Sequence, residues 1–132
     1  MAKATRVLSM YDVPMWESIE RGAWALQRCS GCGVFRYPPS PICPDCHSME
    51  SEWTPLAGTG TLLSWTVFHR QYFDDYKPPY NAVTVRLTEG PIIVTNLVGA
   101  EPDKDCIGRS VVIVYETHEG QLLPRVKYTK SE

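Results

Sequence analysis

The sequence lacks both a strong charge of one sign and a long apolar run. Its 13 Lys and Arg residues nearly balance 15 Asp and Glu residues, for a formal net charge of -2. This balance disfavours a general polyanion binder, because nucleic-acid modules usually carry a basic excess. No apolar stretch reaches the roughly 18 residues that span a bilayer, and neither a signal peptide nor a lipidation motif is visible. We therefore expect a cytoplasmic protein.

Four of the five cysteines lie in two matched pairs. Cys29 and Cys32 form the first pair, and Cys43 and Cys46 form the second. Each pair can place two thiolates on one tight turn, which is the arrangement found in tetrahedral zinc sites. Four thiolates leave no open position for water or substrate, so the predicted zinc is structural and performs no chemistry.

Other uses of these cysteines fit the sequence less well. Disulfides are disfavoured in a reducing compartment. The run Cys43-Pro-Asp-Cys46-His47 matches the haem c attachment pattern, but haem c is normally attached after export and would leave the first pair without a purpose. A redox dithiol needs a thioredoxin-like alternation of strands and helices, which is absent. Iron stays an alternative to zinc, because four thiolates suit both metals.

Apolar residues recur at steps of three and four from Pro14 to Gln27, which predicts a helix. Asp12 is the expected N-cap, and Gly22 is expected to weaken or bend the helix. Trp16 and Trp24 are large residues for so short a helix and need a cover. Either a partner protein or the following domain can supply it.

Five short strands are predicted after a linker at 54–60. They cover 61–69, 81–87, 91–98, 110–116 and 122–128, with Leu63, Trp65 and Val67 sharing one face of the first. Pro124 confines the last strand to an edge or a barrel seam. Five strands without a crossover helix predict a small antiparallel OB-fold barrel, with a loose sandwich as the alternative. Cys106 is expected to be a small buried hydrophobe.

The sequence therefore predicts a mainly β protein in three segments. These are an N-terminal helical docking segment at 1–27, a zinc ribbon at 28–55 and an OB-fold at 56–132. The loop at 70–80 is rich in aromatic residues and cations, and in an OB-fold it borders the ligand face. Such a loop can stack on bases or on an adenine, anchor a protein interface, or pack on its own barrel.

Several motifs together resemble one known family. They are Leu26-Gln-Arg-Cys29, Cys32-Gly33, Arg36-Tyr37-Pro38-Pro39, Cys43-Pro-Asp-Cys46, Gly58-Thr-Gly60, Ser64-Trp-Thr-Val-Phe-His69-Arg70, Pro78-Pro79-Tyr80, Thr95-Asn96-Leu97-Val98-Gly99, Ile107-Gly108 and Leu123-Pro124-Arg125. They resemble the family catalogued as domain of unknown function thirty-five, which joins a rubredoxin-like zinc ribbon to an OB-fold. The likeness covers nearly the whole chain from Trp16 onward.

The resemblance implies a small partner of larger acyl-CoA enzymes. The enzymes it implies are thiolases, thiolase-like lipid-transfer aldolases, acyltransferases and MaoC-type hydratases. It also implies that the OB-fold touches the CoA portion of the substrate or bridges it to the catalytic subunit, while the ribbon and the N-terminal helix serve docking.

Our leading hypothesis is a non-catalytic accessory subunit of a thiolase or lipid-transfer-protein-like aldolase, for example in sterol side-chain or fatty-acyl degradation. His47, His69 and His118 have no candidate triad partners in the sequence, which agrees with a non-catalytic role. A subunit of a MaoC-like hydratase or acyltransferase complex is the alternative. A single-stranded nucleic-acid binder and an iron redox carrier are further alternatives, of which the net charge disfavours the first.

If CoA binds, its phosphates need cations and its adenine needs an aromatic ring. The cations are Arg36, Arg70, Lys77 and Arg86, and either Tyr80 or Trp65 can stack on adenine. The predicted substrate-binding residues are Arg36, Trp65, His69, Arg70 and Tyr80.

Overall fold

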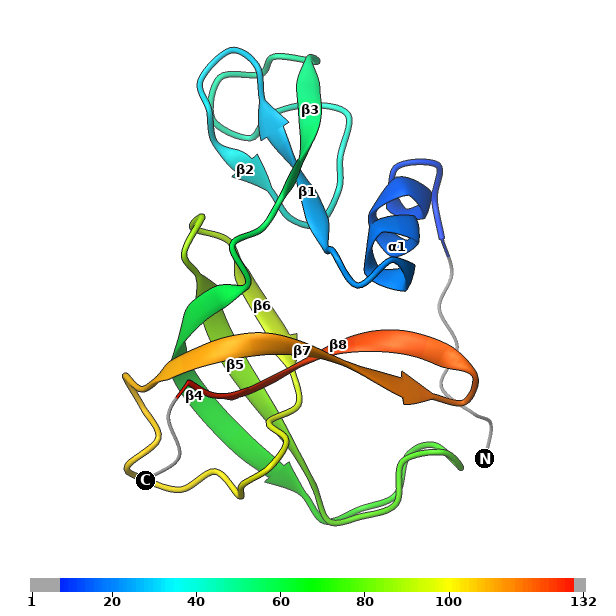
Figure 1. Cartoon of the computed structure of the whole chain (residues 1–132), viewed down its shortest axis with the longest axis vertical. Coiled ribbons are helices and arrows are strands. Elements are labelled where there is room, and N and C mark those ends of the chain that lie inside the picture. The colour runs from blue at the N-terminus through cyan, green and yellow to red at the C-terminus, as the bar shows by residue number, and fades with distance from the viewer. Residues whose placement is uncertain (1–7, 130–132) are drawn as a thin grey trace.

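The computed structural model describes residues 8–129, in which one short helix precedes two antiparallel sheets. The elements are α1 (Asp12–Glu20), β1 (Ala25–Cys29), β2 (Phe35–Arg36), β3 (Ser51–Pro55), β4 (Thr59–Phe68), β5 (Tyr80–Leu87), β6 (Ile92–Thr95), β7 (Ser110–His118) and β8 (Gln121–Tyr128). Figure 1 shows the sheet of β1 to β3 stacked above the sheet of β4 to β8, with α1 beside the junction. No helix among the described residues is long and apolar enough to cross a membrane.

The helix ends earlier than the sequence predicted. α1 stops at Glu20, and β1 already begins at Ala25, so the prediction of helix up to Gln27 is wrong. Gly22 ends the helix with φ 69° while its N–H donates to the Ile19 carbonyl, because glycine adopts this left-handed conformation without strain. The apolar residues after Gly22 therefore belong to the entry of a strand.

The start of α1 also differs from the expectation. Tyr11 is the N-cap residue, and Asp12 is the first residue of the helix. The Asp12 carboxylate accepts a hydrogen bond from the upstream Ser9 N–H at 2.9 Å. Pro14 lies in the first turn, where its missing N–H leaves no helix bond unmade.

The five-stranded sheet has the order β6-β5-β4-β7-β8 and closes only in part. Leu97 and Val126 form a parallel bridge between the two edges, and the Val98 N–H donates to the Val126 carbonyl at 2.9 Å. This is an OB-fold half-barrel, as the sequence predicted. Pro124 lies on β8, an edge strand, which was also expected.

A β-bulge in β4 changes which residues face the core. The register of β4 against β5 shifts between Leu62 and Ser64. Leu62 lies opposite Val85 and is fully buried, while Trp65 lies opposite Val83 and is 37% exposed. The prediction that Leu63, Trp65 and Val67 share one face does not hold through this point, because the shift leaves Leu63 out of the pairing and strict alternation fails at a bulge.

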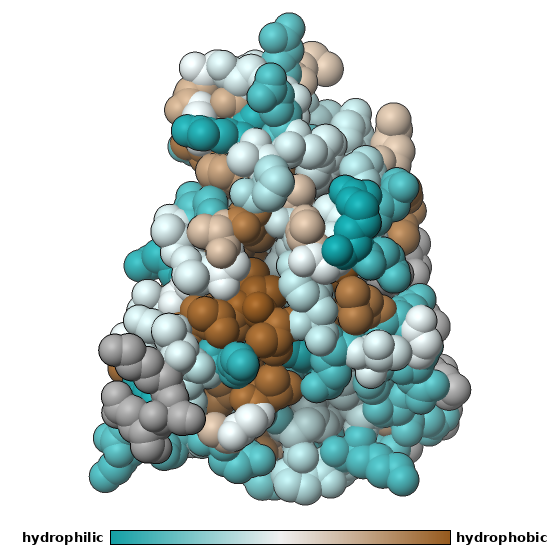
Figure 2. All heavy atoms as spheres, in the orientation of Figure 1, coloured by the Kyte–Doolittle hydropathy of each residue, from teal (hydrophilic) through white to brown (hydrophobic). Residues whose placement is uncertain are grey.

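One hydrophobic core joins the helix, the ribbon and the half-barrel. It contains Ile19, Trp24 and Leu26 together with barrel residues such as Val85 and Val126. Trp24 is therefore covered by the chain itself, and Trp16 packs against the same core. Cys106 is fully buried there, as expected. Figure 2 shows apolar residues gathered in the middle of this face, below the ribbon.

Candidate functional site: a four-cysteine centre and an aromatic loop

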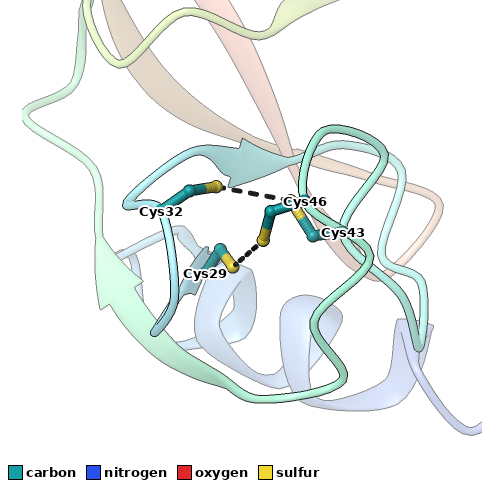
Figure 3. Close-up of side chains that lie close together, drawn as sticks. All are labelled: Cys29, Cys32, Cys43 and Cys46. Carbon is teal, nitrogen blue, oxygen red and sulfur yellow. Dashed lines mark hydrogen bonds between the residues drawn. The ribbon is translucent and has the colours of Figure 1, made fainter.

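The four paired cysteines converge at one point of the ribbon. The Cys29 and Cys46 sulfurs lie 3.5 Å apart, the Cys32 and Cys43 sulfurs lie 3.6 Å apart, and all four lie within 4.8 Å of one another (Figure 3). Disulfide sulfurs are bonded at about 2.05 Å, so these thiols are free. Zn–S bonds of about 2.3 Å put tetrahedral sulfurs about 3.8 Å apart, so the cluster fits a tetrathiolate metal site.

Two similar turns hold the two pairs. The Gly33 N–H donates to the Cys29 carbonyl at 2.9 Å, and the His47 N–H donates to the Cys43 carbonyl at 3.0 Å. Gly33 has φ 81° and His47 has φ 65°, so His47 occupies the position in the second turn that Gly33 occupies in the first. Histidine enters this region more readily than most residues. His47 thus fits a turn position that needs no haem, and both cysteines of the Cys-Pro-Asp-Cys-His run converge with the first pair.

Backbone N–H groups prepare the cluster for metal. The pKa of Cys29 falls to about 6 because the N–H groups of Cys32 and Gly31 donate to its sulfur. The N–H of Cys46 likewise lowers the pKa of Cys43. For Cys32, burial and neighbouring sulfurs outweigh a backbone N–H bond and raise the pKa to about 12. A metal ion must therefore displace protons from part of this cluster when it binds.

Arg36 is buried in the ribbon and links its segments by hydrogen bonds. Its side chain is only 1% exposed, and its guanidinium donates to the carbonyls of Ser40 at 3.2 Å, Ser48 at 3.0 Å and Glu50 at 3.2 Å. These carbonyls belong to the segment that carries the second cysteine pair. Arg36 thus joins that segment to β2, and it lies apart from the other predicted substrate-binding residues.

The aromatic loop at 70–80 packs on its own barrel. Tyr76 stacks on His118 with ring centroids 4.5 Å apart, and Tyr80 stacks on Phe68 at 5.1 Å. His118 Nε2 lies 2.8 Å from a carboxylate oxygen of Asp75, whose side chain is 1% exposed. These contacts fasten the loop to the β7–β8 hairpin. The sequence missed this pair, because the two residues are 43 positions apart and no local pattern connects them.

The remaining predicted residues lie at or near the base of this loop. Tyr80 belongs to the stack, and Arg70 lies over the Tyr72 ring, with the guanidinium carbon 5.3 Å from the ring centroid. His69 and Arg70 are exposed, as is part of Trp65 on β4. The structure thus offers an exposed cation and exposed aromatic surface here, beside a loop that is already ordered.

Comparison with known proteins assigns both halves of the chain. Residues 16–50 match the family model described as "ChsH2, rubredoxin-like zinc ribbon domain", and residues 53–116 match "ChsH2, C-terminal OB-fold domain". A solved structure described as "Ltp2-ChsH2(DUF35) aldolase" superposes with a TM-score of 0.86 and 33% identity, over 96% of this chain and 100% of that one. The chain belongs to the DUF35 family. The resemblance inferred from the motifs is confirmed.

Relatives of this DUF35 protein carry two kinds of name. A "DUF35 domain-containing scaffold protein" of Methanothermobacter thermautotrophicus is 31% identical over 91 residues, which are 67% of this chain and 68% of the relative. A "Probable enoyl-CoA hydratase alpha subunit" of Thermomonospora curvata is 41% identical over 103 residues, which are 77% of this chain and 32% of the relative. The chain thus spans about a third of that hydratase subunit.

Proposed function

We propose that this DUF35 protein is a non-catalytic scaffold subunit that binds and supports a thiolase-superfamily enzyme of acyl-CoA metabolism. The likeness to a chain of the Ltp2-ChsH2 aldolase carries this proposal, because it extends over that entire chain at 33% identity. The scaffold name of the Methanothermobacter thermautotrophicus relative supports it. The preferred partner is a thiolase or a lipid-transfer-protein-like aldolase.

The state of the reactive side chains supports a non-catalytic role. Four cysteines converge on one metal position and can saturate it. His118 is held against Asp75 and Tyr76, so its ring serves packing. Cys106 is fully buried, and burial raises the pKa of its thiol, which disfavours the reactive thiolate.

We propose that the metal is zinc with a structural role. The four-thiolate set and the match to a rubredoxin-like zinc ribbon support this choice. Elemental analysis of protein purified from its native host should find about one zinc per chain in a colourless preparation. A red preparation with stoichiometric iron and reversible one-electron chemistry would show that the metal is iron and not zinc.

For a CoA contact, we propose the exposed surface around Arg70. Arg70 would pair with a phosphate, while Trp65 or Tyr80 would stack on adenine with His69 beside them. Arg36 would act by holding the ribbon folded, since its guanidinium is buried and engaged. Titration with CoA should show weaker binding for Arg70→Ala than for the control Arg21→Ala, which changes an exposed arginine outside the predicted site. Equal CoA affinities of the two variants would show that Arg70 is not part of the CoA site.

Affinity purification of the tagged chain from its native host tests the proposed function. Mass spectrometry should identify a thiolase-like enzyme that co-elutes in stoichiometric amount. The name of the Thermomonospora curvata relative favours a second candidate, an enoyl-CoA hydratase complex, and recovery of a hydratase would select it. Recovery of the chain alone would contradict both scaffold assignments.

A further inference from the structure

A groove separates the N-terminal end of α1 from the outer strand of the ribbon. It has a volume of about 490 Å³ and is lined by residues around the start of α1 and along β3. Figure 1 shows α1 beside the ribbon, far from the loop that joins β6 to β7. Among the described residues, those that line the groove include no cysteine and no member of the hydrophobic core.

The most exposed large apolar side chains of residues 8–129 meet at this groove. Met10 is 76% exposed and Met49 is 73% exposed, and both line it, although one precedes α1 and the other precedes β3. Trp53, at 36% exposed, lines it as well. Methionine and tryptophan are enriched at protein interfaces, where they adapt to a partner and bury a large apolar area.

The charged residues that line the groove are all acidic. Glu50 and Glu52 line it, and no Lys, Arg or His does so among the described residues. Neither carboxylate has an ion-pair partner within residues 8–129. Arg28 lies opposite Glu52 in the β1–β3 register, but its guanidinium donates to the Gly33 carbonyl and lies over the Phe35 ring. The groove thus favours a partner that carries positive charge.

Within residues 8–129, the outer edge of β3 offers backbone groups at the same place that no other strand pairs. β3 is an edge strand in the order β2-β1-β3. The Ser30 N–H donates to the Glu50 carbonyl, and the antiparallel alternation then turns the N–H and C=O groups of Ser51 and Trp53 away from β1. Ser51 and Trp53 line the groove. An extended segment can pair with such an edge.

We infer that this groove docks an extended segment of the partner enzyme that carries an apolar anchor beside Lys or Arg residues. The segment adds to the β3 edge, its apolar side chain packs among Met10, Met49 and Trp53, and its cations pair with Glu50 and Glu52. This inference rests on the proposed scaffold function and specifies the chemistry of the partner surface.

Charge reversal tests the inference on the full chain with the partner that co-purifies with it. The double variant Glu50→Lys/Glu52→Lys should weaken the complex by about tenfold or more at low salt. Its matched control is Glu101→Lys/Asp105→Lys, two exposed acids in the β6–β7 loop at the far end of the molecule (Figure 1), which should change affinity less than about twofold. Zinc content and far-ultraviolet circular dichroism report whether each variant folds. If the lysine variant fails to fold, the neutral pair Glu50→Gln/Glu52→Gln replaces it.

Zero-length carbodiimide crosslinking of the wild-type complex provides a direct readout. Peptides that join Glu50 or Glu52 to a lysine of the partner enzyme would support the inference. An intact complex that gives no such peptides and tolerates charge reversal would overturn it and leave the scaffold function standing. If light scattering shows that the wild-type chain self-associates and the variant does not, the groove binds a second copy and the inference is wrong. Absence of any enzyme partner would overturn the inference and the scaffold function together.

Discussion

Arg36→Met should destabilise the ribbon without changing a metal ligand. Methionine keeps the unbranched apolar stem of arginine but loses all three donated bonds to the carbonyls of Ser40, Ser48 and Glu50. The Ser48 and Glu50 carbonyls keep a second donor, in the N–H groups of Cys43 and Ser30 respectively. Among residues 8–129, no acceptor pairs with the buried Arg36 Nε, so removing this group recovers part of the free energy lost with the three bonds.

The expected loss of ribbon stability is smaller than the summed free energies of three charge-assisted hydrogen bonds. Such bonds contribute about 1.5 to 3 kcal/mol each. Because two of the carbonyls keep a second donor and the buried Nε is removed, we expect a net destabilisation of about 3 kcal/mol. Because metal binding and ribbon folding are coupled, this loss should appear as an apparent zinc affinity about 100-fold weaker.

Competition with a chromogenic zinc chelator measures this affinity. Arg28→Met is the matched control, because Arg28 is exposed in the same ribbon and, within residues 8–129, donates a single long bond, 3.3 Å to the Gly33 carbonyl. The control should bind zinc within about threefold of wild type, since exposed arginines contribute little. An Arg36→Met protein that binds zinc as tightly as this control would refute the structural role assigned to Arg36.

Further substitutions test the metal site, the barrel and the loop. Cys32→Ser should abolish metal binding and loosen the ribbon and α1 while β4 to β8 persist, as amide exchange would show; unchanged zinc content would mean that the ligand set is wrong. Gly60→Ala places a Cβ 2.7 Å from the Arg86 carbonyl oxygen, so the free energy of unfolding should fall by about 2 kcal/mol, and an unchanged denaturation midpoint would contradict this. His118→Ala removes a partner of the Asp75 carboxylate and should speed amide exchange across 70–80, whereas equal rates would show that the pair does not hold the loop.

Local sequence patterns predicted the metal site and most strands. The cysteine spacing determines two turns of a few residues each, so it needed no long-range information. Apolar alternation in the second half located all five barrel strands to within a few residues. Pro124 also indicated the position of β8 at an edge.

The errors arose where a short pattern fits two structures. The apolar residues Trp24 and Leu26 suit both a helical step and strand alternation, and only the left-handed conformation of Gly22 separates them. The bulge near Leu62 could not be read from alternation. The burial of Arg36 and the Asp75–His118 contact depend on segments brought together by the tertiary fold, which no local window contains.

The most direct test of the scaffold role is the turnover of the co-purified partner enzyme with and without this chain. The partner is stripped of the DUF35 protein, assayed with its acyl-CoA substrate, and assayed again after one equivalent is added back. We predict that activity or solubility falls on removal and returns on re-addition. An enzyme that keeps its full rate and stability alone, and does not respond to re-addition, would contradict the account.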